Sequence, residues 1–363
     1  MSLKLYKWGV EQIPPTEFIF EITTDDSTKT YTMVLDAGGT YDFTIDWGDG
    51  SGVDTITAYD DADLVHEFPS LETAYTVTMV GSCDILDFSS SPQVLWITKL
   101  LDVADLGFTQ LSFNGCEYLT EISPNLCRLK SLTTAASMFA SCWGLTSIPE
   151  GIFDGSTGIT TFSLCFAWNS ITNLPEDLFR YQQSLGGNPF EYAFAGMQIT
   201  TIPANLLKWS GTQIDYLDGT FAYCESLTTV PTDLFRYNTA IVASWSTFEG
   251  CVGLETVSAN LFKYNTSCIA FIYTFLDCNK LQLNANIFYA DGEQDTRFLN
   301  QDVDFTGCFY RSSFTGTQGE APDLWTCDFG TGSATSTDTF AGAGNDAESI
   351  SNFAGIPDGW KGL

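Results

Sequence analysis

The sequence predicts two kinds of structure in one chain: a small all-β sandwich near the N-terminus, followed by an α/β solenoid built from short repeats. Three observations support this prediction. Residues 17 to 85 alternate apolar and polar side chains as strands do, a Phe-x-x-Cys-x-x-Leu unit recurs from residue 113 onward, and 363 residues exceed the usual size of one domain. We expect an N-terminal arm at 1–16, the sandwich at 17–88, the repeats at 89–315, and degenerate repeats or a cap at 316–363.

Short antiparallel strands are expected in the first folded segment. Four stretches alternate in the way that half-buried strands do: Phe18 to Ile22, Tyr31 to Leu35, Tyr41 to Ile45, and Ala74 to Val80. Glycine-rich and aspartate-rich turns separate them, for example between Gly48 and Gly52. Several short strands with such turns are typical of a sandwich.

This segment resembles the polycystic-kidney-disease (PKD) domain family. The resemblance rests on Ile45-Asp-Trp-Gly-Asp-Gly50, His66-Glu-Phe68 and Tyr75-Thr-Val-Thr78. Phe68 stands where the family usually has tyrosine, and residues 69–73 form a longer insert before the last strand. The resemblance implies an immunoglobulin-like (PKD-like) sandwich that serves as a spacer or docking module, and it specifies no ligand.

One unit then recurs along the chain. Its first half reads Phe-x-x-Cys-x-x-Leu and then Thr-x-Ile-Pro, and its second half is a short segment such as Pro149-Glu-Gly-Ile-Phe153. Successive leading phenylalanines from Phe113 to Phe275 lie 26, 27, 28, 27, 27 and 27 positions apart. That period falls within the range of about 20–29 residues of leucine-rich repeats, with one strand and one short helix per coil. Because a single unit cannot bury its own apolar face, the units must stack.

The cysteine position of the unit is predicted to point inward at a turn, where a small side chain satisfies backbone groups. Asn169 takes this position in one unit, which favours a structural ladder over a metal site. The odd total of eleven cysteines and the lack of a Cys-x-x-Cys pair favour buried, reduced thiols over disulfides. The predicted ladder consists of Cys116, Cys142, Asn169, Cys224, Cys251, Cys278 and Cys308.

The complete unit resembles the BspA-type leucine-rich repeats of bacterial surface proteins and some bacteriophage proteins. The resemblance covers roughly residues 90 to 315, and Phe340 and Ile356-Pro357 look like remnants of further units. It implies a scaffold or adhesin without catalysis.

The charge of the chain limits its partners. With 45 acidic and 14 basic residues the formal net charge is −31, so binding to nucleic-acid phosphates or to an anionic membrane surface is not expected. No segment approaches the roughly 18 apolar residues of a membrane span, and the N-terminal residues are too short and polar for a signal peptide.

A column of basic–aromatic pairs recurs at one place in successive units: Arg180-Tyr181, Lys208-Trp209, Arg236-Tyr237 and Lys263-Tyr264, with Arg128 at the equivalent earlier position. Two interpretations stay open. The pairs form a ladder that binds glycans or an acidic partner, since cations and sugars are attracted to aromatic faces. Alternatively, each cation offsets the dipole at the C-terminus of a short helix, and stacking repeats it automatically.

Three further features carry weaker hypotheses. Asp46 and Asp49 lie in an aspartate-rich zone that could supply oxygen ligands to calcium, although no complete calcium-loop motif is present and a solvated acidic loop explains them as well. His66 is the one histidine, and no nucleophile motif surrounds it, so no catalytic residue and no cofactor are expected. The arm could dock on a partner through Leu5, Tyr6 and Trp8.

These observations together predict a non-enzymatic structural or adhesive protein. The first hypothesis is a bacteriophage virion component, such as a head-decoration, fibre or tail-associated protein, that docks through its N-terminal region and presents the repeats outward. Its partners would be other virion proteins and host glycans or receptors, and homo-oligomerisation is compatible with such a role. The alternative is a bacterial cell-surface adhesin that binds host matrix or glycans.

Overall fold

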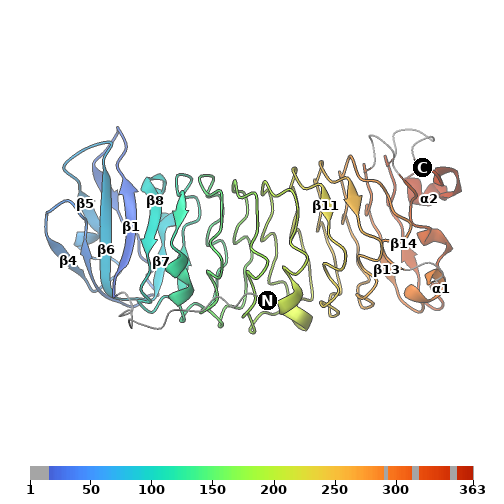
Figure 1. Ribbon diagram of the computed structural model, residues 1–363, viewed down its shortest axis with the longest axis horizontal. Helices are drawn as coiled ribbons and strands as arrows, with labels where there is room; N and C mark the ends of the chain where they lie inside the picture. Colours follow the sequence, from blue (N-terminus) through green and yellow to red (C-terminus); the bar gives the residue numbers. More distant parts are fainter. Residues whose placement is uncertain (1–15, 290–292, 313–318, 344–349, 363) are drawn as a thin grey trace, which may run out of the picture.

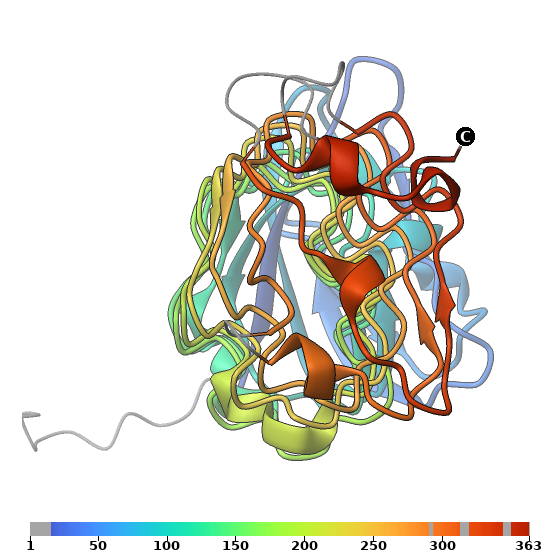
Figure 2. The same ribbon diagram turned by 90° about the vertical axis from the view of Figure 1, so that its right-hand side faces the viewer.

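The computed structural model describes residues 16–289, 293–312, 319–343 and 350–362. The molecule is elongated, with the N-terminal strands at one end and the repeated units extending to the other end (Figure 1). Viewed along the long axis, successive units follow nearly the same path (Figure 2). One continuous apolar core runs through the molecule from Phe18 to Ile356.

The N-terminal end contains a six-stranded sheet with the strand order β10-β8-β1-β6-β3-β4. Neighbouring strands are antiparallel except for the β10–β8 pair, which is parallel. Alternate residues of β1 are buried, as its amphipathic sequence requires. The six strands are β1 (Phe18–Thr23), β3 (Tyr41–Asp46), β4 (Val53–Ile56), β6 (Ala74–Cys83), β8 (Ile97–Asp102) and β10 (Glu121–Ile122).

A two-stranded antiparallel sheet, β2 (Thr30–Thr32) with β5 (Val65–Glu67), contributes aromatic residues to the core at this end. The ring of Tyr31 in β2 lies 5.9 Å from that of Trp47, and His66 in β5 stacks on Trp47 at 4.8 Å. Trp47 is fully buried, and its indole N–H donates to Asp54 at 2.9 Å. This aromatic cluster therefore joins β2 and β5 to the turn after β3.

The remaining regular elements are short. Among the described residues, three two-stranded parallel sheets join neighbouring segments. Their strands are β7 (Ile85–Asp87) with β9 (Gln110–Ser112), β11 (Thr229–Val230) with β12 (Thr256–Val257), and β13 (Val303–Asp304) with β14 (Ala334–Thr335). The described residues contain two α-helices, α1 (Gln294–Arg297) and α2 (Asp358–Lys361). The 3-10 turns are η1 (Ala62–Leu64), η2 (Phe88–Ser90), η3 (Val94–Trp96), η4 (Pro124–Arg128), η5 (Lys208–Gln213), η6 (Leu324–Thr326) and η7 (Phe353–Gly355).

We refer to the described residues between 109 and 343 as the repeat stack. Its units are held together by backbone hydrogen bonds at equivalent positions: the amide of Phe139 donates to Cys165, that of Phe166 to Ala193 and that of Phe194 to Thr220. The leading phenylalanines are fully buried and stack face to face, with ring centroids 5.0–6.2 Å apart. This column consists of Phe88, Phe113, Phe139, Phe166, Phe194, Phe221, Phe248, Phe275, Phe309 and Phe340.

The predicted α/β leucine-rich-repeat solenoid is wrong. That fold requires a strand and a helix in each unit, whereas the described residues are mostly loops and short strands, with several small sheets and two four-residue α-helices near the C-terminal end. The second half of each unit is a segment of about five residues, led by proline in most units and by Ser258 or Asn284 in two later ones, and it is too short to sustain a helix without tertiary help. It forms turns instead, or the short 3-10 helix η4 in the unit at residues 124–128.

The predicted immunoglobulin-like sandwich is corrected as well. Strands are confirmed at 18–22, 41–45 and 74–80, and the one expected at 31–35 covers Thr30–Thr32. However, β1 pairs with β8 on one side and β6 on the other, so the main sheet includes strands beyond residue 88, while β2 and β5 form only a small sheet. The alternation of side chains predicts strands but does not specify which strand pairs with which.

A further contact holds neighbouring units together, besides the backbone hydrogen bonds and the phenylalanine column. An aromatic residue in a left-handed conformation covers a glycine of the next unit. Tyr223 has φ +59° and lies against Gly250, where an added Cβ would come within 2.5 Å of the ring. The same relation holds for Trp168 with Gly196, Tyr192 with Gly219, and Tyr273 with Gly307. These glycines also have positive φ values, so two independent constraints exclude a side chain there.

Candidate functional site

The predicted cysteine ladder occupies the interior of the repeat stack. Cys142, Cys224, Cys251 and Cys278 each donate the thiol to the carbonyl of the leading phenylalanine one unit earlier, at 3.1–3.2 Å. Burial raises the pKa of Cys142 and that of Cys224 to about 12. Such thiols stay protonated at neutral pH, act as hydrogen-bond donors, and are poor nucleophiles.

The other members of the predicted ladder differ in detail. Cys116 is fully buried at the start of the column, and Asn169 donates to the carbonyl of Phe166 in its own unit at 2.6 Å. Cys308 is misplaced in the prediction. The ring that stacks on Phe275 belongs to Phe309, and the hydroxyl of Ser312 donates to the carbonyl of Phe275 where a cysteine would in earlier units.

The cause of this error is a shift of register in the late unit. Phe305, taken as a leading phenylalanine, stacks instead on Phe271 at 5.6 Å in a different column. Because Phe305 and Phe309 are both large and apolar, the sequence offers two registers, and packing selects the second.

A column of buried polar side chains was missed by the sequence analysis. Asn238 donates its amide to the carbonyls of Leu207 and Gly211, and Asn265 donates to those of Phe235 and Asn238, all at 2.8–3.0 Å. Both asparagines are fully buried. Each follows a basic–aromatic pair directly, as Gln182 does, so the recurrent Arg/Lys-Tyr-Asn/Gln triplet was an available signal.

The structure brings the predicted basic–aromatic pairs together along the stack. Lys208 lies over both Trp209, at 4.9 Å, and Tyr237 of the next unit, at 5.5 Å. Arg236 likewise lies 5.0 Å from the ring of Tyr264 in the next unit, and Arg180 lies over its neighbour Tyr181. The cations therefore connect successive units.

Most of these cations also have carboxylate partners. Arg180 pairs with Asp154 at 2.8 Å and with Asp177, Arg236 pairs with Asp233, Lys263 with Glu293, and Arg128 with Asp102. No helix of the described residues ends at Arg180, Arg236 or Lys263, so the helix-dipole interpretation does not explain them. Ion pairs and ring contacts within and between units explain them better.

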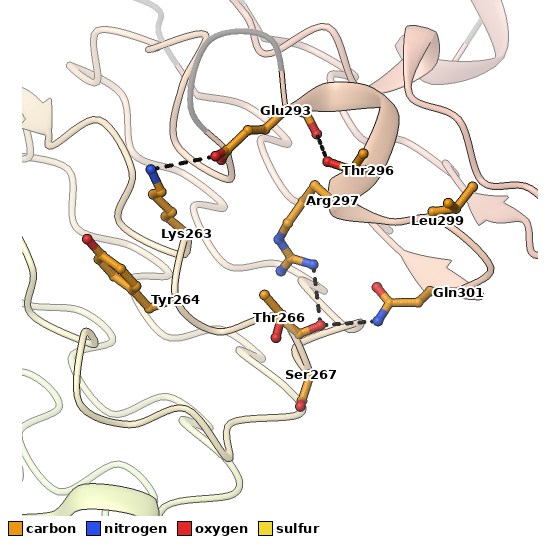
Figure 3. A pocket seen from close by; sticks show the side chains of 9 residues that line it. All are labelled: Lys263, Tyr264, Thr266, Ser267, Glu293, Thr296, Arg297, Leu299 and Gln301. Carbon is orange, nitrogen blue, oxygen red and sulfur yellow. Dashed lines mark hydrogen bonds and ion pairs between the residues drawn. The ribbon is translucent and has the colours of Figure 1, made fainter.

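A cavity of about 500 Å³ lies at the end of this stripe, beside Lys263 and Tyr264 (Figure 3). Arg297 projects from α1 into it. Its guanidinium donates to the carbonyls of Asn265 and Cys268, at 2.9 and 3.2 Å. Arg297 thus acts as the buried asparagines do, because it donates to backbone carbonyls of an earlier unit. Burial lowers the pKa of its guanidinium to about 10. Its position indicates a structural clamp on carbonyl groups.

A second set of residues forms an exposed surface that combines aromatic rings with carboxylates. We define the acidic–aromatic surface as Tyr192, Tyr223, Trp245 and Tyr273 together with Glu191, Asp218 and Glu249. The side chains of Tyr223, Trp245 and Tyr273 are 41–43% exposed. The sequence analysis missed this surface, although its tyrosines stand two positions before or after a leading phenylalanine.

A groove of about 370 Å³ is hollowed into this surface, lined by Glu191, Tyr192, Asp218, Trp245, Ser246, Ile272 and Tyr273. These residues come from four successive units, so only the stacked structure creates the groove. Burial, with the nearby charge of Glu191, raises the pKa of Asp218 to about 6. One carboxylate oxygen of Asp218 accepts from Asn188 at 2.9 Å, and the other has no hydrogen-bond partner among the described residues.

The remaining predicted residues lie near the N-terminal end. Asp46 accepts from the amide of Gly48, and Asp49 accepts from that of Ser51 and pairs with His66 at 2.8 Å. These carboxylates are thus used to fix the turn, and the described residues contain no group of three or more His, Cys, Asp or Glu that could hold a metal ion. Leu5, Tyr6 and Trp8 of the predicted docking arm lie outside the described residues.

Within the described part of the chain, no helix has the length and apolar character needed to cross a membrane. Comparison with protein-family models gave no match, and comparison with curated proteins gave none either. The candidate site that remains is therefore defined by geometry alone: an exposed aromatic surface with carboxylates that lack cationic partners among its lining residues.

Proposed function

We propose that this chain is a non-enzymatic adhesive protein that binds a partner through the acidic–aromatic surface of its repeat stack. One observation carries the proposal: Tyr223, Trp245 and Tyr273, from three successive units, are 41–43% exposed beside a groove whose described lining residues include carboxylates and no cation. Tyrosine and tryptophan are the residues that most often dominate binding interfaces, and clustered exposed apolar groups mark such interfaces.

The elongated shape supports the same role. The N-terminal strands lie at one end and the repeats extend away from them (Figure 1), so attachment through the N-terminal region would leave the repeats free to present their surface. We propose a bacteriophage particle as the site of attachment, with a bacterial cell surface as the alternative. All eleven cysteines are free, which fits assembly in a reducing compartment before release.

Density-gradient centrifugation of a native lysate, with antibody detection of the chain, tests the location. Co-sedimentation with DNA-containing particles supports attachment to a virion, whereas recovery with the cell envelope supports the alternative. Recovery only as a free soluble protein would contradict both.

Adhesion itself is tested with the purified, fluorescently labelled chain and intact bacteria from the same source, by flow cytometry. The triple variant Tyr223→Ser, Trp245→Ser, Tyr273→Ser is expected to lose most cell binding. The matched control is Tyr59→Ser, which removes a 47% exposed ring near the N-terminal end. Equal loss in both variants, or no loss in the triple variant, would refute the proposed surface.

A further inference from the structure

The composition of the groove in the acidic–aromatic surface favours a positively charged ligand. Its lining contains three aromatic rings, Tyr192, Trp245 and Tyr273, and two carboxylates, Glu191 and Asp218. Of the residues that the structure describes, no lysine, arginine or histidine lines it. Aromatic faces carry a negative quadrupole, and a carboxylate carries a full negative charge, so both attract cations.

The negative field extends beyond the groove. Glu249, which accepts from the hydroxyl of Tyr223 at 2.6 Å, adds its charge near Tyr192, together with Asp218 and Glu191. Arg311 pairs with Asp277 at 3.1 Å and is thereby partly neutralised. A cation that enters the groove therefore gains attraction from several groups at once.

The carboxylates distinguish between types of cation. Glu191 is exposed, and its carboxylate can accept hydrogen bonds from a ligand. A primary ammonium group carries three hydrogen-bond donors and a trimethylammonium group carries none, so a primary ammonium makes better use of this site. The flexible alkyl stem of a lysine would lie along the rings, as such stems do on apolar surfaces.

We propose that this groove binds a lysine side chain of a partner protein, with the ammonium at Glu191 and Asp218 and the alkyl stem against Trp245 and Tyr273. The groove is open and formed by four successive units, and Tyr223 continues the exposed aromatic surface beside it. An extended polypeptide segment fits such a surface better than a free small amine. The inference rests on the proposed binding role of this surface and names the chemistry of its partner.

Fluorescence anisotropy with the full chain tests the proposal. The probes are three labelled peptides of alternating glycine and lysine: one unmodified, one with acetylated lysines and one with trimethylated lysines. The unmodified peptide is expected to bind best, and acetylation to abolish binding. Equal or tighter binding of the trimethylated peptide would overturn the choice of a primary ammonium.

Variants separate the groove from the general attraction of an acidic protein for a basic peptide. Trp245→Ala and Tyr273→Ala leave the charge unchanged and are each expected to weaken binding by about tenfold, from the size of cation–ring interactions. Glu191→Gln with Asp218→Asn should abolish groove binding, whereas the control Asp60→Asn with Glu67→Gln removes the same charge from exposed positions elsewhere and should have little effect.

These experiments distinguish failure of the lysine site from failure of the proposed adhesive function. Equal weakening by the groove and control variants would show nonspecific attraction and overturn the lysine site. If the triple aromatic variant still loses cell binding while the lysine peptide fails to bind, the adhesive role stands and the partner is not recognised through lysine. Because Glu191 is exposed, Glu191→Gln also provides a test that does not depend on refolding of the core.

Discussion

The contact between Tyr223 and Gly250 allows a sharp test of how the repeat units are locked together. Gly250 has φ +70°, and a Cβ at this position would lie 2.5 Å from Cδ1 of Tyr223. Gly250→Ala should therefore incur two penalties. A left-handed backbone with a side chain costs about 1–2 kcal/mol, and overpacking against a fixed ring costs about 1–3 kcal/mol more.

Gly187→Ala supplies the matched control. Gly187 has nearly the same φ, +67°, but no atom of the part of the chain that the structure describes lies within 4 Å of the position of its added Cβ. Gly187→Ala should therefore lose stability only because alanine must adopt the left-handed backbone. The smaller conformational entropy of the unfolded variant offsets part of this loss. We expect a loss of about 1 kcal/mol for Gly187→Ala and about 3 kcal/mol for Gly250→Ala.

Urea denaturation followed by circular dichroism measures both losses. The double variant Tyr223→Ala, Gly250→Ala completes a mutant cycle, and removal of the ring should recover at least about 1 kcal/mol of the Gly250→Ala loss. If Gly250→Ala and Gly187→Ala shift the midpoint equally, the ring is not held against the glycine and the proposed locking is wrong. A cycle without coupling would lead to the same conclusion.

Three further predictions follow from the interior and from the groove. Under native conditions a thiol reagent should label only Cys127, the one cysteine that is not buried, and in denaturant it should label all eleven; rapid native labelling of Cys251 would contradict its buried position. Asn265→Ala removes the buried side-chain hydrogen bonds to the carbonyls of Phe235 and Asn238, which keep only their backbone donors, and should destabilise the chain by about 1–3 kcal/mol in urea titrations; a loss below about 0.5 kcal/mol would be the contrary result. Asp218→Asn should raise the melting temperature most at pH 7.5 and least at pH 4.5. Burial and the charge of Glu191 raise the pKa of Asp218 from its usual 3.8 to about 6 in the folded state, and Tyr192 also faces the group. The charged form is therefore penalised above pH 6, and the penalty disappears as the pH falls toward 4. A difference independent of pH would show that Asp218 is not the titrating group.

The sequence predicted the repeat itself because identical side chains must meet when units stack. The phenylalanine column and the thiols of Cys142 and Cys251 recur at a nearly constant spacing, so their burial follows from periodicity. Secondary structure within each unit could not be predicted in the same way. The period matches that of leucine-rich repeats, yet the conformation depends on left-handed residues such as Trp168 and Tyr223, which no propensity favours.

The acidic–aromatic groove could not be predicted from the sequence for a related reason. Its lining residues do not occupy one constant position of the repeat: Trp245 stands three residues before its leading phenylalanine, and Tyr273 stands two before. Only the lateral stacking of four units brings them together with Asp218. The basic–aromatic pairs, by contrast, recur at one position and were easily seen, but their cations are largely satisfied by carboxylates such as Asp154.

The locking of rings against glycines also bears on how the surface could bind. Tyr192 and Tyr273 are held from below by Gly219 and Gly307, and their own positive φ values restrict the directions in which the rings can project. A ring that is already fixed loses little conformational freedom when a ligand covers it, so more of the contact energy contributes to affinity. The same contacts that hold neighbouring units together would therefore preorganise the proposed binding surface, and a substitution such as Gly219→Ala should weaken binding as well as stability.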